Sequence, residues 1–284
     1  MRVEYVLGLA SHGFHRVHYT EWGDPDNDSV LICVHGLTRN SRDFDLLATV
    51  LQQDYRVVCP DLPGRGLSEW LPDKADYQYS HYLQAMAVLL ARLRVEQVEW
   101  LGTSLGGVIG LLLAGQPNTP IRRLLLNDVG PFISKAALAR IGAYVGKAPR
   151  FKDLHHLEAY VRTVYAGFGE LTDAQWGHLA FHSGKRLPNG EYALHYDPAI
   201  GEMFRKQVSH PVDLWKTWDA ICCPVRVLRG EHSDVLTRET MAEMQVRGPK
   251  AEVIEFRRCG HAPALMATEQ IMAVRDWFVG RRTR

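Results

Sequence analysis

Residues 98–113 read VEWLGTSLGGVIGLLL, an apolar run, a turn with a glycine two residues either side of Ser104, and a second apolar run with helical spacing. A serine at a tight strand-to-helix turn is held in a strained conformation, and a Cβ at Gly102 or Gly106 would collide with the neighbouring strand or helix. The free N–H groups and the positive dipole end of the following helix face the same spot. The stretch therefore predicts that the Ser104 hydroxyl is raised above a sheet as a nucleophile.

Three further polar sites follow apolar strand-like runs. His35-Gly36 ends the run 29–34, Asp234 follows 225–229, and His261 follows 252–256. In a parallel sheet the carboxyl ends of the strands share one edge, so these loops converge although they are far apart in sequence. Nucleophile, acid and base then occur in the order Ser, Asp, His.

This combination resembles the α/β-hydrolase superfamily, of the capped serine-esterase type, over nearly the whole chain. The resemblance implies a catalytic triad and an oxyanion hole built from backbone N–H groups. The triad would be Ser104, Asp234 and His261, the N–H donors would belong to Leu37 and Leu105, and His35 would be a structural residue that holds the Leu37 loop.

The acid has an alternative. Asp128 also follows a strand-like run and also lies between Ser104 and His261, where some members of the fold place the carboxylate. We favour Asp234, because residues 230–236, GEHSDVL, resemble the usual acid loop. Asp128 is then expected to make local hydrogen bonds in its turn.

The expected fold class is α/β: a mostly parallel sheet with helices on both faces and a helical cap inserted between core strands. A leading antiparallel hairpin is expected over 3–10 and 15–22. The strand–helix alternation stops near residue 131 and resumes near 224, which predicts a core over 1–131 and 213–284 and a helical cap over 132–212 without a buried strand. The cap helices are expected near 134–145, 153–166 and 172–183, the last capped by Thr172.

Substrate contacts are predicted from the cap and from the loop after His35. Among the cap aromatics, Phe132 and Trp176 are the candidates to contact an apolar acyl group. Arg39 would either bind a carboxylate or polar head group of the substrate, or pair with Asp43 in a structural contact.

Composition excludes several classes of function. The chain has 284 residues with 33 basic and 32 acidic side chains, so neither a nucleic acid nor an anionic membrane is expected as partner. There is no signal-peptide pattern and no apolar run long enough to span a membrane, and five cysteines lack ligand-like spacing. We expect a cytoplasmic protein with reduced thiols and a small-molecule ester as partner, and the sequence leaves the oligomeric state open.

No cofactor and no metal are expected. His178 and His182 stand four residues apart on one helix face, but the sequence shows no third ligand, so we expect two partly exposed polar residues.

The predicted function is hydrolysis of a small to medium carboxylic ester through an acyl-enzyme on Ser104. Lactonase, thioesterase and carbon–carbon bond hydrolase activities remain alternatives on the same triad. A different class is nucleotide binding, because residues 102–107 are glycine-rich and Asp128 lies about 20 residues downstream. That alternative has Ser104 where the central glycine should be, and it leaves His261 without a role. A non-catalytic, receptor-like module is a further alternative.

Overall fold

An eight-stranded sheet forms the centre of the molecule in the computed structural model, which describes residues 1–207 and 210–280. Its strand order is β1-β2-β4-β3-β5-β6-β12-β13; β1 and β2 are antiparallel to their neighbours, and the other pairs are parallel. The strands are β1 (Arg2–Ala10), β2 (Gly13–Trp22), β3 (Val30–Val34), β4 (Arg56–Pro60), β5 (Val98–Thr103), β6 (Ile121–Asn127), β12 (Val225–Gly230) and β13 (Glu252–Phe256).

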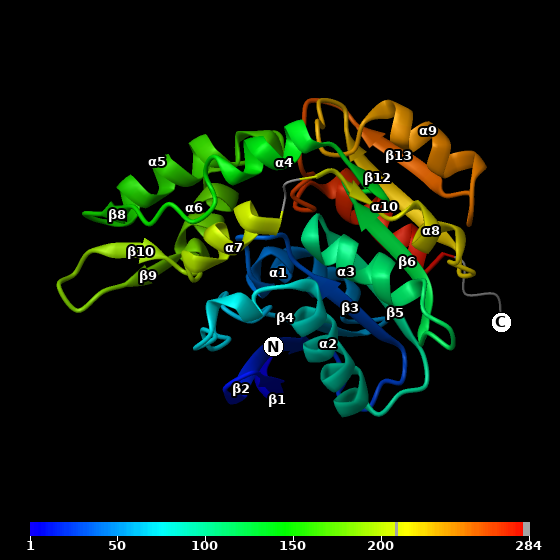
Figure 1. The fold of residues 1–284 in the computed structure, drawn as a ribbon, viewed down its shortest axis with the longest axis horizontal. Coiled ribbons are helices and arrows are strands. Elements are labelled where there is room, and N and C mark those ends of the chain that lie inside the picture. The colour runs from blue at the N-terminus through cyan, green and yellow to red at the C-terminus, as the bar shows by residue number, and fades with distance from the viewer. Residues whose placement is uncertain (208–209, 281–284) are drawn as a thin grey trace.

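Helices cover both faces of this sheet (Figure 1). Alternate residues of β3 point to opposite faces: Ile32 joins the apolar core beneath one set of helices, and Leu31 joins the core beneath the other. The first set is α2 (Tyr79–Leu93), α3 (Leu105–Ala114), α8 (Trp215–Asp219) and α9 (Arg238–Val246); the second is α1 (Asp45–Leu51) and α10 (Thr268–Phe278). The predicted fold class and the leading hairpin are confirmed.

The segment from β7 (Phe132–Ile133) to β11 (Val212–Asp213), inserted between β6 and β12, lies to one side of the sheet (Figure 1). Its ends meet, because β7 pairs with β11. Between them come α4 (Lys135–Gly142), β8 (Arg150–Phe151), α5 (Leu154–Val164), α6 (Asp173–Ser183), β9 (Gly184–Arg186), β10 (Tyr192–Leu194) and α7 (Ala199–Gln207). We call this segment the cap, and its treatment as a separate domain over 132–212 stays a prediction. Residues 208–209 of the predicted cap and residues 281–284 of the predicted core lie outside the described residues.

The cap differs from the expectation in one respect. Besides the helices it contains a three-stranded antiparallel sheet of order β8-β10-β9. These strands have two or three residues each, too few to show an alternating pattern in the sequence. The predicted start of α6 is confirmed, since the Thr172 side chain accepts a hydrogen bond from the Gln175 N–H and the Gln175 side chain accepts one from the Thr172 N–H.

Three short helical turns complete the described chain: Ser41–Phe44, Lys74–Asp76 and Ala166–Phe168. Among the residues that the structure describes, no helix combines the length and the apolar character needed to cross a bilayer.

The glycine at 106 is needed for the turn above β5. A Cβ there would lie 2.1 Å from the carbonyl oxygen of Val34, so the backbone of β3 would have to move. We expect Gly106→Ala to lower the free energy of unfolding by about 2–3 kcal/mol, measured by urea denaturation. The control is Gly177→Ala in α6, where the nearest atom to an added Cβ is a Glu158 oxygen at 3.9 Å; better helix propensity should raise the free energy by about 0.5–1 kcal/mol. If Gly106→Ala does not lower the free energy of unfolding relative to Gly177→Ala, this packing argument is wrong.

Candidate active site

Ser104 lies at the turn between β5 and α3 with φ 51° and ψ −114°, a conformation that non-glycine residues rarely adopt. The two flanking glycines permit it. A Cβ at Gly102 would lie 2.2 Å from the Gly106 carbonyl oxygen, and Gly106 itself lies against Val34. The turn therefore aims the Ser104 hydroxyl away from the sheet, as the sequence predicts.

A hydrogen-bonded chain runs from this hydroxyl to a buried carboxylate. The His261 Nε2 atom lies 2.9 Å from Ser104 Oγ, and His261 Nδ1 lies 2.7 Å from Asp128 Oδ2. With a carboxylate as its partner, Nδ1 carries the proton, which leaves the Nε2 lone pair facing the hydroxyl. This is the arrangement in which an imidazole can accept a proton from serine.

The carboxylate that faces His261 belongs to Asp128, so the prediction of Asp234 is wrong. Asp128 follows β6 directly and is fully buried. Its Oδ1 accepts a hydrogen bond from the Gly230 N–H at 2.8 Å, and its Oδ2 accepts one from the Ser233 hydroxyl at 2.6 Å in addition to His261. A buried carboxylate with three donors is fixed in position and does not need a cation beside it.

Asp234 lies on the neighbouring loop after β12, but its carboxylate is about half exposed and pairs with Arg140 of α4, at 2.8 Å from Nη2 and also through Nε. In this loop, which resembles an acid loop, Ser233 reaches the site and donates to Asp128. The position of Asp128 directly after a strand-like run is the feature of the sequence that indicates its role. The resemblance of residues 230–236 to an acid loop favours Asp234 instead.

The same contacts weaken the dinucleotide-binding alternative. That alternative requires the Asp128 carboxylate to accept hydrogen bonds from a ribose. Here both of its oxygens are already occupied by groups of the chain itself, and the residue has no exposed surface.

His35 fixes the loop that follows β3. Its Nε2 accepts a hydrogen bond from the Leu62 N–H at 3.0 Å, so Nδ1 bears the proton and donates to the Gly36 carbonyl at 2.7 Å. Burial lowers the pKa of His35 to about 3, an effect only partly opposed by its hydrogen bond to Gly36. The residue is thus a neutral structural element, as the resemblance implies.

Arg65 supports the same loop and was not predicted. It is fully buried, donates from Nε to the Leu37 carbonyl at 2.9 Å, and donates from Nη1 to the Pro63 carbonyl and the Tyr82 hydroxyl. Its guanidinium also lies 4.9 Å from the centre of the Tyr82 ring. An arginine in a glycine-rich loop reads as a solvated residue in sequence, so only its burial reveals the role.

Leu37 and Leu105 both line a cavity that also contains Ser104 and His261. Within the described part of the chain, neither backbone N–H donates a hydrogen bond. Two backbone donors without partners, from residues that line the same cavity as the serine, are suited to an oxyanion. Their role as an oxyanion hole stays a prediction.

The cavity has an empty volume of about 1090 Å³, which includes space open to solvent. Its walls come from the loops above the sheet and from the cap, and most of them are apolar or aromatic; those from the cap include Ile133, Leu138, Ile141, Tyr144, Tyr165, Phe168 and Phe204. Phe132 and Trp176 are not among the lining residues, so the cavity gives no support to their prediction as substrate contacts, which stays a prediction. Trp176 packs inside the cap with Leu157 and Leu179.

Arg39 lines the cavity, but each of its three side-chain nitrogens already makes a hydrogen bond within the chain. Nε and Nη2 pair with the Asp43 carboxylate, and Nη1 donates to the Ser183 hydroxyl. The side chain is 4% exposed and lies 4.7 Å from the centre of the Tyr165 ring. Of the two predicted roles, the structure supports the pairing with Asp43.

Several hydrogen bonds connect the cap to the loops of the site. The Thr38 and Tyr165 hydroxyls lie 2.9 Å apart, Asn40 donates to the His182 carbonyl, and the Gly260 N–H donates to the Gly167 carbonyl at 2.7 Å. The cap is therefore joined to the segment that carries Leu37 and to the segment that carries His261.

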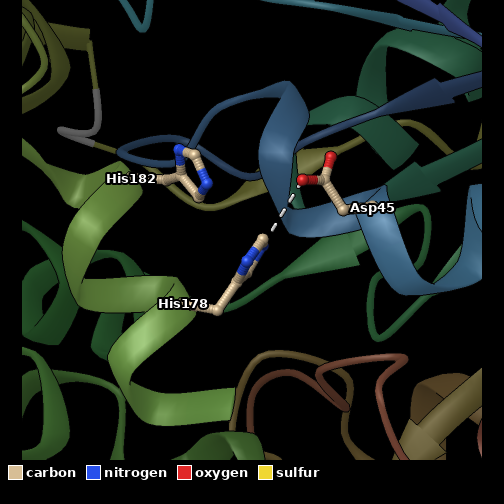
Figure 2. A group of neighbouring side chains, drawn as sticks. All are labelled: Asp45, His178 and His182. Atoms are coloured by element: carbon tan, nitrogen blue, oxygen red, sulfur yellow. Dashed lines mark ion pairs between the residues drawn. The ribbon is translucent and has the colours of Figure 1, made fainter. Parts of the chain in front are cut away.

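The two histidines of α6 have a third neighbour that the sequence did not show. Figure 2 shows Asp45 at the start of α1 beside His178 and His182, and one donor atom from each residue lies within 4.8 Å of the others. The carboxylate is already paired with Arg42 through Nε and Nη2, and His178 Nε2 lies 2.8 Å from the Arg42 carbonyl. A cation would have to displace that guanidinium, so the expectation of no metal stays unchanged.

The buried imidazole of His35 predicts a pH dependence of stability. The unfolded chain takes up a proton at histidine near pH 6.5, whereas folded His35 does so only near pH 3. The neutral His35 therefore makes its full contribution to the free energy of unfolding above pH 6.5. As the pH falls from 6.5 toward 3 this contribution is lost, and the free energy of unfolding is lower by about 2 kcal/mol at pH 5. Nitrogen NMR of the imidazole should show a neutral ring protonated at Nδ1 at both pH 7 and pH 5; an imidazolium signal at pH 5 would contradict this.

Comparison with known proteins agrees with this architecture. A family model described as the alpha/beta hydrolase family matches residues 31–274. The chain is 47% identical over 98% of its length to a 3-hydroxybutyrate-oligomer hydrolase from Cupriavidus necator, of which it covers 98%.

Two solved structures are also similar over nearly their whole length. The structure of a Rickettsia typhi protein has a TM-score of 0.93 at 33% identity, covering 99% of this chain and 100% of that one. An alpha/beta hydrolase from Novosphingobium aromaticivorans has a TM-score of 0.87 at 37% identity, covering 97% and 98%. The chain therefore belongs to the alpha/beta hydrolase family.

Proposed function

We propose that this protein hydrolyses ester bonds of short 3-hydroxybutyrate oligomers through an acyl-enzyme on Ser104. The observation that carries the proposal is the hydrogen-bonded chain from Ser104 through His261 to Asp128. Ser104 and His261 line a largely apolar cavity in which a substrate can lie. The choice of substrate is supported by the 47% identity to the Cupriavidus necator hydrolase over almost the full length of both chains.

The proposed reaction has two steps on the same groups. His261 Nε2 takes the proton as Ser104 Oγ attacks the ester carbonyl, and the N–H groups of Leu37 and Leu105 receive the negative oxygen. The imidazolium then gives this proton to the departing 3-hydroxyl group, so an alcohol leaves and an acyl-serine remains. Water, deprotonated by the same imidazole, attacks the acyl-serine and releases a carboxylic acid, while the proton returns to Ser104.

Asp128 acts through His261 in both steps. Its carboxylate keeps the proton on Nδ1 and stabilises the transient imidazolium without accepting the proton. Because the Gly230 N–H and the Ser233 hydroxyl also hold the carboxylate, it can orient the ring without moving itself.

The cavity suits an oligoester better than a charged polymer. Repeating ester units carry no charge along the chain, and the lining is dominated by aliphatic and aromatic side chains. Burial raises the pKa of Tyr79 to about 12 and that of Tyr144 further, so these two phenols stay neutral hydrogen-bonding groups at physiological pH.

The proposed activity is tested with 3-hydroxybutyrate dimer and trimer, with products separated by chromatography. We expect the native protein to release 3-hydroxybutyrate and Ser104→Ala to be slower by about 10⁴-fold or more. A fluorophosphonate should add to Ser104 of the native protein, as shown by peptide mass spectrometry. The control is Ser11→Ala, in the β1–β2 turn where the hydroxyl bonds only to Asp76; it should retain both properties. Release of monomer by Ser104→Ala at the native rate would refute the proposal.

The two aspartates give a second test, with p-nitrophenyl butyrate as a neutral substrate. We expect Asp128→Asn to lower kcat by about 10⁴-fold, because the amide no longer holds the proton on Nδ1 of His261. Asp234→Asn breaks an exposed pair with Arg140 and should lower kcat by less than tenfold. Equal losses, or a larger loss at Asp234, would overturn the assignment of Asp128.

A further inference from the structure

Two cationic side chains, Arg39 and Arg140, line the cavity above Ser104 among the described residues. An oligomer of 3-hydroxybutyrate has a single charged group, the carboxylate at one end. A cation in the cavity wall is therefore the feature that can distinguish this end from the neutral remainder of the substrate.

Arg39 is not available for such a ligand. Asp43 already neutralises its charge through two nitrogens, Ser183 takes the third, and the side chain is almost fully buried. An additional anion would have to break a buried ion pair, which is strongly unfavourable.

Arg140 is also paired with an aspartate through two nitrogens, but it differs from Arg39 in its exposure and in its third nitrogen. Its side chain is 46% exposed, and its partner Asp234 is 47% exposed. Nε and Nη2 face Asp234, while Nη1 makes no hydrogen bond to any described residue. Exposed ion pairs contribute little to stability, so this guanidinium can accept another carboxylate at Nη1 or exchange Asp234 for it at small cost.

The position of Arg140 on α4 directs it toward the substrate. Leu138, Ile141 and Tyr144 of the same helix and its following turn also line the cavity, so the guanidinium borders an apolar surface on which the oligomer would lie. Guanidinium groups bind carboxylates through two parallel hydrogen bonds, which fixes orientation as well as adding affinity.

We infer that Arg140 is a subsite for the terminal carboxylate of the substrate, with Asp234 holding the guanidinium in place until the substrate carboxylate replaces it. The inference rests on the proposed oligoester hydrolysis. Binding the acid end at a fixed point determines which ester bond, counted from that end, reaches Ser104. Arg140 is thus a specificity-determining residue, and Asp234 competes with the substrate for it.

The test compares the 3-hydroxybutyrate trimer with its methyl ester, which lacks the charge. We expect Arg140→Ala to lower the acid-to-methyl-ester ratio of kcat/KM by about 10- to 100-fold, mainly through KM for the acid. Arg140→Lys should lose part of this preference, since it keeps the charge without the planar pair of donors. The matched control is Lys135→Ala, which removes one exposed positive charge from the same helix outside the cavity and should leave the ratio as it is.

Asp234→Asn separates binding from a purely structural contact between cap and core. If Arg140 binds the substrate carboxylate, removing its competitor raises the acid-to-methyl-ester ratio, opposite to Arg140→Ala. If the Arg140–Asp234 pair only holds the cap against the core, the two substitutions break the same contact and shift the ratio in the same direction. A shift in the same direction, or no shift for Arg140→Ala, would overturn the inference.

A failure of the proposed function is recognised separately. Calorimetric titration of Ser104→Ala protein with trimer acid and with its methyl ester measures binding without turnover. If the native protein cleaves neither trimer, the proposed function fails. Tighter binding of the acid that is lost in the Ser104→Ala/Arg140→Ala double variant then still supports the carboxylate subsite, and equal binding of acid and ester refutes it.

Discussion

The buried carboxylate of Asp128 is the constraint on which the site depends. It receives hydrogen bonds from the β12 strand end, from the loop after it and from His261, which itself lies on the loop after β13. One anion thus joins the ends of β6, β12 and β13 at a single point. A buried carboxylate without hydrogen-bond donors would destabilise the fold, so Asp128 needs its three donors. The imidazole of His261 in turn needs the carboxylate to hold the proton on Nδ1.

The opposite side of the site depends on two other buried polar groups. His35 is neutral and connects the Gly36 carbonyl to the Leu62 N–H, and Arg65 holds the carbonyl of Leu37. Together they fix the peptide groups around Leu37 without using its N–H. The side chains of Thr38, Arg39 and Asn40 make further hydrogen bonds in the same loop. If the Leu37 N–H serves as the predicted oxyanion donor, a position held in this way needs no rearrangement when charge develops on the substrate.

The cap contributes much of the cavity wall, and none of the residues in the hydrogen-bonded chain Ser104–His261–Asp128 comes from it. Its hydrogen bonds to Thr38, Asn40 and Gly260 join it to the loops that follow β3 and β13, and its apolar side chains line the cavity. Arg140 is the exception in this apolar surface. It extends the cap to the loop after β12, where Asp234 meets it. In the proposed mechanism the reacting groups therefore lie at the sheet edge, and the cap supplies the carboxylate subsite.

Local periodicity, and the glycines that a tight turn requires, were enough to predict the order of strands and helices and the turn at Ser104, and the resemblance to the α/β-hydrolases added His261. The cap was predicted from the point where the alternation stops, and its short strands carry no periodic signal. The choice between Asp128 and Asp234 required the folded structure, since both follow strands at the same sheet edge and the choice depends on which side chain is buried beside the imidazole. The roles of Arg39, Arg65 and Arg140 also required the folded structure, because the sequence shows only that each is an arginine. Contacts with distant segments set their environments. Arg39 is buried in an ion pair with Asp43, Arg65 supports the Leu37 loop, and Arg140 is an accessible cation.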